Sequence, residues 1–149
     1  MKKIFLLFAL LICIAAGNLH AQLRKVSSEV TEAFKAKFPN AEKVEWKDKV
    51  SYFEADFVSD GFEMSANFSG KGAWKETNKK ISFDLLPEAV KVGFNKSKYN
   101  DWTPGSVTQI EKKGKSVRYK IFVEKSSLVQ NKFLYFNEDG QLKKEEQSM

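Results

Sequence analysis

An internal repeat constrains the fold of this chain more than any other feature of its sequence. Apolar residues recur at an offset of 60, then 66, then 68: Val30 and Phe34 with Val90 and Phe94, Phe53 with Tyr119, and Phe68 with Phe136. The offset only grows, and each step falls where a loop is expected. We therefore predict one unit used twice, over residues 22–83 and 84–149, within one compact domain.

Each predicted unit begins with a short helix. In the first unit, Val30 and Phe34 follow helical spacing and Pro39 ends the segment. In the second unit, Pro87 suits the first helical turn, and Gly93 stands at the repeat position of Ala33. A small residue on the buried side of a helix lets the helix approach a sheet closely, which would offset the cost of a glycine inside it.

Four strands are expected after each helix. The tetrapeptide Ser59-Asp60-Gly61-Phe62 predicts a two-residue β-hairpin. Its register pairs apolar residues on a face that packs against the helix and leaves the opposite face mostly polar; the pairs are Phe53 with Phe68, Ala55 with Ala66, and Phe57 with Met64. Shorter strands are predicted over 43–46, 73–77, 107–111 and 141–144. The expected fold class is α+β, a tandem duplication of a helix-plus-four-strand antiparallel unit with the helices on one face of the sheet.

The same register in the second unit places aromatic residues on the face away from the helices. There Phe122 pairs with Phe133, Lys120 pairs with Tyr135, and Arg118 lies beside Asn137. Because a contiguous apolar patch usually marks a contact site, we predict a partner-binding surface made of Tyr52, Trp102, Arg118, Lys120, Phe122, Phe133 and Tyr135, with Trp102 in a loop at the rim. The alternative is that a loop, the chain terminus or a second copy covers these rings.

The first 21 residues have the pattern of an export signal. Lys2 and Lys3 precede an apolar run of 13 residues, Ile4–Ala16, whereas a membrane-spanning helix needs about 20. Cleavage after Ala21 is expected; an uncleaved anchor or a lipid anchor on Cys13 is less favoured, because Ile12 rather than a small residue precedes the cysteine. This pattern predicts a periplasmic or extracellular protein with no membrane span after cleavage.

Removal of this signal eliminates whole classes of chemistry. The remaining 128 residues (149 less 21) contain no cysteine and no histidine, since Cys13 and His20 lie in the signal. Disulfides, thiol nucleophiles, histidine bases and cysteine or histidine zinc sites are therefore excluded. Glu54 and Asp56 share the polar sheet face, but nothing apolar there would raise a carboxyl pKa, so we expect no catalytic residue, no metal and no cofactor.

The basic residues do not have the composition of a nucleic-acid-binding protein. Without Lys2 and Lys3, 23 basic groups stand against 19 acidic ones, and all the basic groups except Arg24 and Arg118 are lysines. Arginine is the residue of choice for bidentate contacts with phosphate and bases. We therefore predict an unknown protein or peptide as the partner and no nucleic acid.

Several of these residues together resemble a known family. The pattern Phe38-Pro39-x-Ala41-x-x-Val44-x-Trp46, with residues 52–57, Gly72-x-Trp74 and Leu86-Pro87, resembles the PepSY-like, beta-lactamase-inhibitor-like family of exported bacterial proteins. The resemblance implies that all strands form one curved sheet with the helices on its convex side. It also implies that the concave face binds a partner, as it does in the inhibitors that give the family its name, and it implies no catalytic residue.

Two functional hypotheses follow from the sequence. The first is a non-enzymatic exported module that binds a protein or peptide, in an inhibitor-like manner, through the open sheet face. The alternative is a small-ligand carrier or sensor in the cell envelope, with its pocket between the sheet and Trp102.

Overall fold

The computed structural model describes residues 24–126 and 130–148, and the expected export signal lies outside these residues. The elements follow in the order α2 (Ser28–Lys37), β1 (Glu42–Asp48), β2 (Phe53–Ser59), β3 (Phe62–Phe68), β4 (Trp74–Ile81), the short 3-10 helix η1 (Phe83–Leu85), α3 (Glu88–Lys96), β5 (Thr103–Lys112), β6 (Arg118–Lys125), β7 (Gln130–Asn137) and β8 (Leu142–Gln147). None of the helices in this described part is long and apolar enough to cross a membrane.

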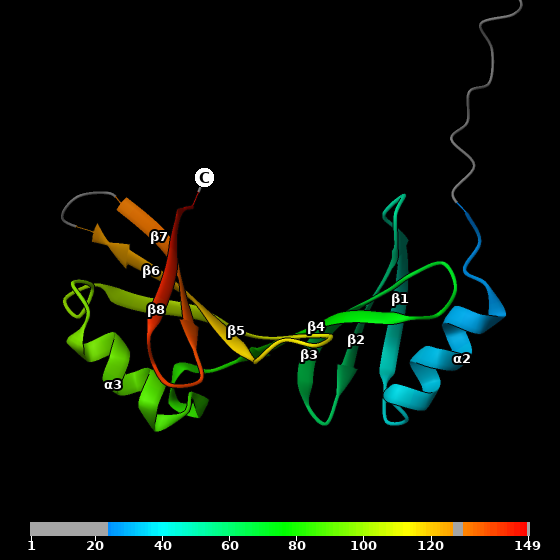
Figure 1. Ribbon diagram of the computed structural model, residues 1–149, viewed down its shortest axis with the longest axis horizontal. Coiled ribbons are helices and arrows are strands. Elements are labelled where there is room, and N and C mark those ends of the chain that lie inside the picture. The colour runs from blue at the N-terminus through cyan, green and yellow to red at the C-terminus, as the bar shows by residue number, and fades with distance from the viewer. Residues whose placement is uncertain (1–23, 127–129, 149) are drawn as a thin grey trace, which may run out of the picture.

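The eight strands form one antiparallel sheet in which sequence order equals spatial order, β1 to β8. Figure 1 shows the two halves of the sheet rising on either side of the central strands β4 and β5, with α2 outside one half and α3 outside the other. The sheet is therefore bent, and the expected α+β class is confirmed.

The predicted hairpin is present and sets the register of β2 and β3. Asp60 and Gly61 both have positive φ, 51° and 81°, as a two-residue turn of this kind requires. Phe53 pairs with Phe68, Ala55 with Ala66, and Phe57 with Met64, as predicted. Tyr119 with Phe136, Lys120 with Tyr135, and Phe122 with Phe133 likewise pair between β6 and β7. The two registers that carry the site prediction are confirmed.

Register also shows that both helices cover the same face of the sheet. A row of paired residues runs across the strands from Phe57 through Met64, Lys79, Gln109 and Tyr119 to Phe136. Phe57 belongs to the core cluster of α2, and Phe136 belongs to the core cluster of α3. Since directly paired residues point to the same side of a sheet, both clusters lie on one side, and no helix of residues 24–126 and 130–148 covers the opposite side, the open face.

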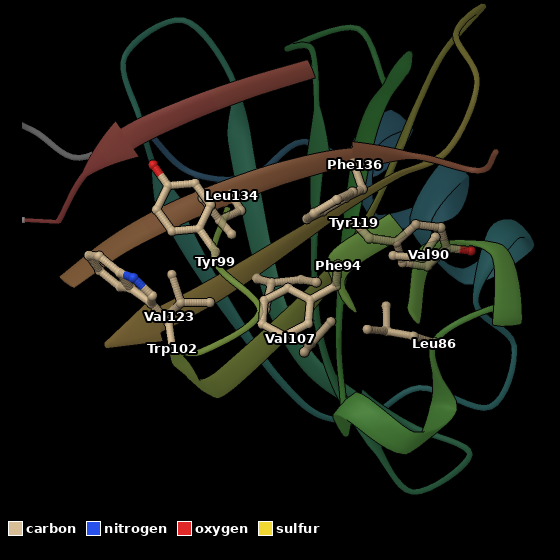
Figure 2. Close-up of a cluster of buried hydrophobic side chains, with 11 residues drawn as sticks. Leu86, Val90, Phe94, Tyr99, Trp102, Val107, Tyr119, Val123, Leu134 and Phe136 are labelled. Carbon is tan, nitrogen blue, oxygen red and sulfur yellow. The ribbon is translucent and has the colours of Figure 1, made fainter. Parts of the chain in front are cut away.

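The core is divided into two clusters. Val30 and Phe34 of α2 pack on the buried residues of β2 and β3. Val90 and Phe94 of α3 pack on the larger cluster, which contains Leu86, Tyr99, Trp102, Val107, Tyr119, Ile121, Val123, Leu134 and Phe136 and is drawn in Figure 2. Between the clusters, the row on the helix side carries the polar residues Lys79 and Gln109.

The boundaries of one strand differ from the prediction in a way that matters for the site. The segment Thr103-Pro104-Gly105 was expected to be loop, but it forms the start of β5, with an irregularity in the pairing between Pro104 and Val107. Pro104 lies before this irregularity, at the start of the strand, where a missing N–H is tolerated. Trp102 consequently lies immediately before a strand rather than within a long loop.

Candidate functional site

A groove of about 770 Å³ crosses the open face of the sheet. Its middle is lined by Lys80 of β4 and by Thr108 and Ile110 of β5. Asp56 and Glu63 line it in the first half of the sheet, and Lys120 and Tyr135 line it in the second half. The remaining lining residues are Lys43, Phe57, Val58, Met64, Ser65, Glu76, Asn78 and Lys112. The bent sheet therefore forms a hollow that spans β1 to β7.

Carboxylates in the first half of this face are paired with lysines. Lys47 pairs with Asp56 and Lys80 pairs with Glu63, and the Lys49 ammonium lies 3.5 Å from Glu54. The hydrogen bond from Lys80 lowers the pKa of Glu63. Exposed ion pairs of this kind contribute little to stability, because water and salt screen the charges. Glu54 and Asp56 thus lie in a solvated ionic surface, which offers neither of them the apolar surroundings that an acid catalyst needs.

The second half of the face carries an aromatic pair instead. The rings of Phe122 and Phe133 lie 5.5 Å apart between centroids and are tilted by 58°. Both side chains are half-buried. The Lys120 ammonium lies 3.9 Å from the centroid of Phe133, within the range of a cation–π contact. A Cβ built on Gly105 would lie 2.9 Å from Cδ1 of Phe122, so the absence of a side chain there makes room for this ring.

Tyr135 continues the aromatic surface and is fixed by β8. Its hydroxyl donates a hydrogen bond to Oε2 of Glu146 at 2.6 Å. Burial, with smaller contributions from this hydrogen bond and the charge of Glu146, raises the pKa of Tyr135 to about 12. Lys144 forms an ion pair with the same carboxylate, and its hydrogen bond is the main cause of the lowered pKa of Glu146. The Tyr135 ring is thus held in place by a charged hydrogen bond at the sheet edge.

A second hollow, also of about 770 Å³, adjoins this aromatic surface. It is lined by Lys120, Phe133, Glu146, Gln147 and Ser148. Lys120 also lines the groove described above. Its side chain therefore stands between the two hollows, beside the ring of Phe133.

The structure places four predicted site residues together, has Arg118 nearby on the same face, and separates Tyr52 and Trp102 from them. Lys120, Phe122, Phe133 and Tyr135 lie on adjacent strands on the open face. Arg118 is on the same face at the start of β6, but it lines neither hollow. Tyr52 lies in the turn before β2, and β3 to β6 separate that strand from β7.

The expectation that Trp102 lies at the rim of the site is wrong. Its side chain is only 9% exposed and belongs to the core cluster on the helix side. Its ring meets that of Tyr99 edge to face, with centroids 5.1 Å apart. Figure 2 shows the two side chains next to each other in the cluster. The physical reason is the early start of β5, which holds the residue before it against the core. The small-ligand pocket that the sequence predicted between the sheet and Trp102 is therefore not lined by Trp102, because this side chain is buried on the helix side.

Glu146 is a site residue that the sequence analysis missed. The last strand was expected to end at residue 144, but β8 continues to Gln147. Leu142 packs against the helix-side core, so simple alternation from it would place Lys144 and Glu146 on that side. A shift in the pairing between Tyr135 and Phe136 instead puts Lys144 opposite Tyr135 and Glu146 opposite Phe133, on the open face. No cluster of three or more potential metal ligands occurs among residues 24–126 and 130–148.

Comparison with known proteins gives the same picture of the fold. A family model described as "Putative beta-lactamase-inhibitor-like, PepSY-like" matches residues 51–144. A BLIP-like protein from Bacteroides fragilis has a similar solved structure, with 30% identity, a TM-score of 0.79, and coverage of 87% of this chain and 92% of that one. A DUF2874 family protein from Bacteroides ovatus is 26% identical, with a TM-score of 0.78 and coverage of 83% and 89%.

A more distant structure, described as one of the "putative periplasmic proteins" of Bacteroides eggerthii, shares the fold at 23% identity, with a TM-score of 0.78 and coverage of 83% and 90%. No curated protein matches the chain. The family model spans well over half of the sequence, and the solved relatives are covered nearly end to end. The chain belongs to the PepSY-like, beta-lactamase-inhibitor-like family.

Proposed function

We propose that this protein is a non-enzymatic exported module that binds a protein or peptide through the open face of its sheet. The observation that carries the proposal is the half-buried aromatic pair Phe122–Phe133, which lies beside a hollow on the face that neither helix covers. Partly exposed aromatic rings in a polar surround are typical of contact surfaces. The description of the Bacteroides fragilis relative as BLIP-like supports an inhibitor-like role for the same face.

The location of the protein follows from its family and its first residues. The chain is exported, to the periplasm or to the medium, because residues 1–21 have the pattern of an export signal and family relatives include a protein described as periplasmic. A partner on that side of the membrane would meet the open face directly.

The aromatic and ionic parts of the face would contribute differently to binding. Removing the rings of Phe122 and Phe133 from water supplies favourable free energy, at about 25 cal/mol per Å² of apolar surface. The charges along the groove set the orientation and the association rate of a partner more than its affinity. We expect the second half of the sheet to hold the partner and the first half to orient it.

A small-ligand carrier or sensor is the second candidate. The groove volume of about 770 Å³ is in the range of small-molecule sites. Its lining, however, contains Asp56, Glu63, Glu76 and several lysines, whereas small-molecule sites are mostly apolar. Native mass spectrometry of protein purified from its own host tests this second function. A carrier or sensor should show the mass of a bound small molecule in the spectrum.

We also infer that the two halves of the sheet derive from one unit used twice. The support is the order of one helix and four strands that both halves share, together with one glycine just before the last strand of each half. Gly72 and Gly140 both have φ of 77°, and each lies against the helix of its own half, near Glu29 and Ala89 respectively. On this inference, the aromatic pair is a feature that the second unit alone carries, since Asp56 and Ser65 stand at the corresponding positions of the first.

Site-specific photo-crosslinking in the native envelope tests the proposed face. Benzoylphenylalanine is introduced at position 133, on the open face, and in a matched variant at Val92, an exposed apolar residue of α3 on the helix side. We expect a discrete adduct from position 133 and none from position 92. Equal crosslinking from both positions, or none from 133, would contradict the proposal.

The double substitution F122S/F133S gives the second arm of this test. The expected result is loss of the partner adduct from a crosslinker placed at Ile110 in the same groove, with an unchanged circular dichroism spectrum. Because Phe122 contacts Gly105, the single substitution F133S is included as a variant that leaves this contact intact. The proposal would be wrong if the double variant unfolds while F133S still captures the partner, because the rings would then belong to the core.

A further inference from the structure

The position of Lys120 gives the open face a specific chemical preference. This side chain lines both hollows, and its ammonium lies 3.9 Å above the ring of Phe133. The ring is half-buried, so one side of the ammonium faces an aromatic surface while the other side faces the hollows. A group that a partner inserts into either hollow beside Phe133 therefore meets a positive charge.

Two of the other three lysines that line the groove are already neutralised, and the third, Lys43, lies in β1, away from the aromatic pair. The Lys112 ammonium lies 2.6 Å from Oε2 of Glu76, and Lys80 is paired with Glu63. In the described part of the chain, Lys120 forms no ion pair, and its nearest interaction of this kind is the aromatic ring of Phe133. Lys120 thus offers a charge that the sheet itself does not satisfy.

Glu146 is the carboxylate that could compete for this charge. It lies across from Phe133 in the register, and Lys120 contributes slightly to lowering its pKa. Its oxygens, however, already accept the hydroxyl hydrogen bond of Tyr135 and pair with Lys144. The neighbouring basic residue Arg118 adds further positive charge on the same face of β6.

We infer that the partner presents a carboxylate next to an apolar side chain, as an acidic protein loop does, with the carboxylate on Lys120 and the apolar group on Phe133 and Phe122. This inference rests on the proposed function and names the chemistry of the partner at that site. The ring beneath the ammonium displaces part of its hydration, so that less water must be removed when a carboxylate binds. An amine or a neutral amide would lack the attraction and would meet an unpaired cation.

The test uses a pair of dipeptides that differ only in charge. N-acetyl-phenylalanyl-aspartyl amide and its asparaginyl counterpart are titrated separately into the isotope-labelled protein and followed by two-dimensional amide NMR. We expect the acidic peptide to shift the amide signals of Lys120, Phe133 and Tyr135, and to bind about fivefold more tightly than the neutral one. Added salt should reduce this difference, because it screens exposed charges.

Two matched variants locate the charge responsible. K120Q should remove the difference between the peptides, while K96Q, which removes an exposed lysine of α3 on the helix side, should leave it unchanged. Equal affinity for both peptides, a preference that persists in K120Q, or signals that shift only elsewhere would overturn the inference. These outcomes leave the proposed function standing if crosslinking from position 133 still succeeds, whereas failure of the crosslinking overturns the proposed function whatever the peptides do.

Discussion

Gly93 of α3 lies directly against the backbone of Gly140, in the turn that leads into β8. A Cβ built on Gly93 would lie 1.9 Å from the carbonyl oxygen of Gly140, and one built on Gly140 would lie 1.9 Å from the carbonyl oxygen of Ala89. The two backbones are therefore in contact, and neither position has room for a side chain. This contact holds α3 close to the second half of the sheet, beneath the aromatic surface.

The first prediction is that Gly93→Ala destabilises the protein although alanine is the better helix former. Helix propensity alone would add about 1 kcal/mol of stability. The methyl group, however, meets backbone atoms that cannot rotate away, and overpacking of this kind costs about 1–3 kcal/mol or more. We expect a net loss of about 1–2 kcal/mol in the free energy of unfolding, measured by chemical denaturation.

Gly70→Ala is the matched control, because Gly70 has no heavy atom within 4 Å of a built Cβ and does not have positive φ. Its effect should be within about 0.5 kcal/mol. A stabilised Gly93→Ala variant would show that α3 does not lie this close to the turn at Gly140.

The second prediction concerns the hairpin between β2 and β3. Gly61 has φ of 81° and open space around its Cα, so alanine there is penalised by conformation and not by packing. The left-handed conformation costs a residue with a Cβ about 1–2 kcal/mol, and Gly61→Ala should lower the free energy of unfolding by that amount.

Asp60→Asn provides the comparison, since asparagine adopts positive φ. Oδ1 of Asp60 accepts a hydrogen bond from Asn40 and Oδ2 accepts one from Ser59, and the amide oxygen of asparagine can keep one of these two bonds. Thermal denaturation of the two variants should separate them clearly. Equal stabilities would mean that the turn conformation does not set the register.

This hairpin explains why so much of the open face could be predicted from sequence. A two-residue turn leaves one possible pairing, and the alternation of side chains then assigns each residue of β2 and β3 to a face. The same assignment, carried to β6 and β7 through the predicted repeat, correctly paired Phe122 with Phe133 and Lys120 with Tyr135. Such local rules need no knowledge of distant contacts.

Trp102 and Glu146 could not be placed in this way, because their positions depend on contacts far away in the sequence. Trp102 is buried by side chains from α3 to β7, and the irregular start of β5 that brings it there breaks the simple alternation on which sequence reasoning relies. Glu146 lies in a charged segment, Lys143 to Gln147, with no apolar alternation to mark a strand. This segment becomes a strand because it pairs with β7.

The third prediction is a high-pH transition at Tyr135. Its folded-state pKa is raised to about 12 from an ordinary value of 10.0, so the stability linked to this hydroxyl is present below about pH 10 and is lost as the pH rises towards 12. Glu146→Gln should lower the pKa of Tyr135 while leaving it above 10, because burial is the largest cause of the shift.

Ultraviolet difference titration measures this transition, with Tyr135→Phe identifying its contribution among the four tyrosines. Glu124→Gln, an exposed change on the same half of the sheet, is the control and should leave the pKa of Tyr135 in place. An unchanged pKa in Glu146→Gln would contradict the hydrogen bond.

The last prediction concerns the ion pair that joins the segment before α2 to the end of β1. The Arg24 guanidinium donates to both carboxylate oxygens of Asp48, with Nη2 2.6 Å from Oδ1, and its backbone N–H donates to Oδ2 at 2.9 Å. The side-chain hydrogen bond from Arg24 is the main reason why the pKa of Asp48 falls from 3.8 to about 2. A lowered folded-state pKa contributes stability above about pH 4, and this contribution is lost as the pH falls towards 2.

Arg24→Gln should therefore raise the pKa of Asp48 towards 3.8 and flatten the dependence of stability on pH between about 4 and 2. Arg24→Lys keeps the charge but loses the planar fork, so it should give an intermediate pKa. Carbon-detected NMR of the Asp48 carboxyl group measures the pKa directly, and Lys25→Gln is the neighbouring control. A pKa that stays near 2 in Arg24→Gln would show that the backbone N–H groups of Arg24 and Val50, which also donate to this carboxylate, are sufficient without the guanidinium.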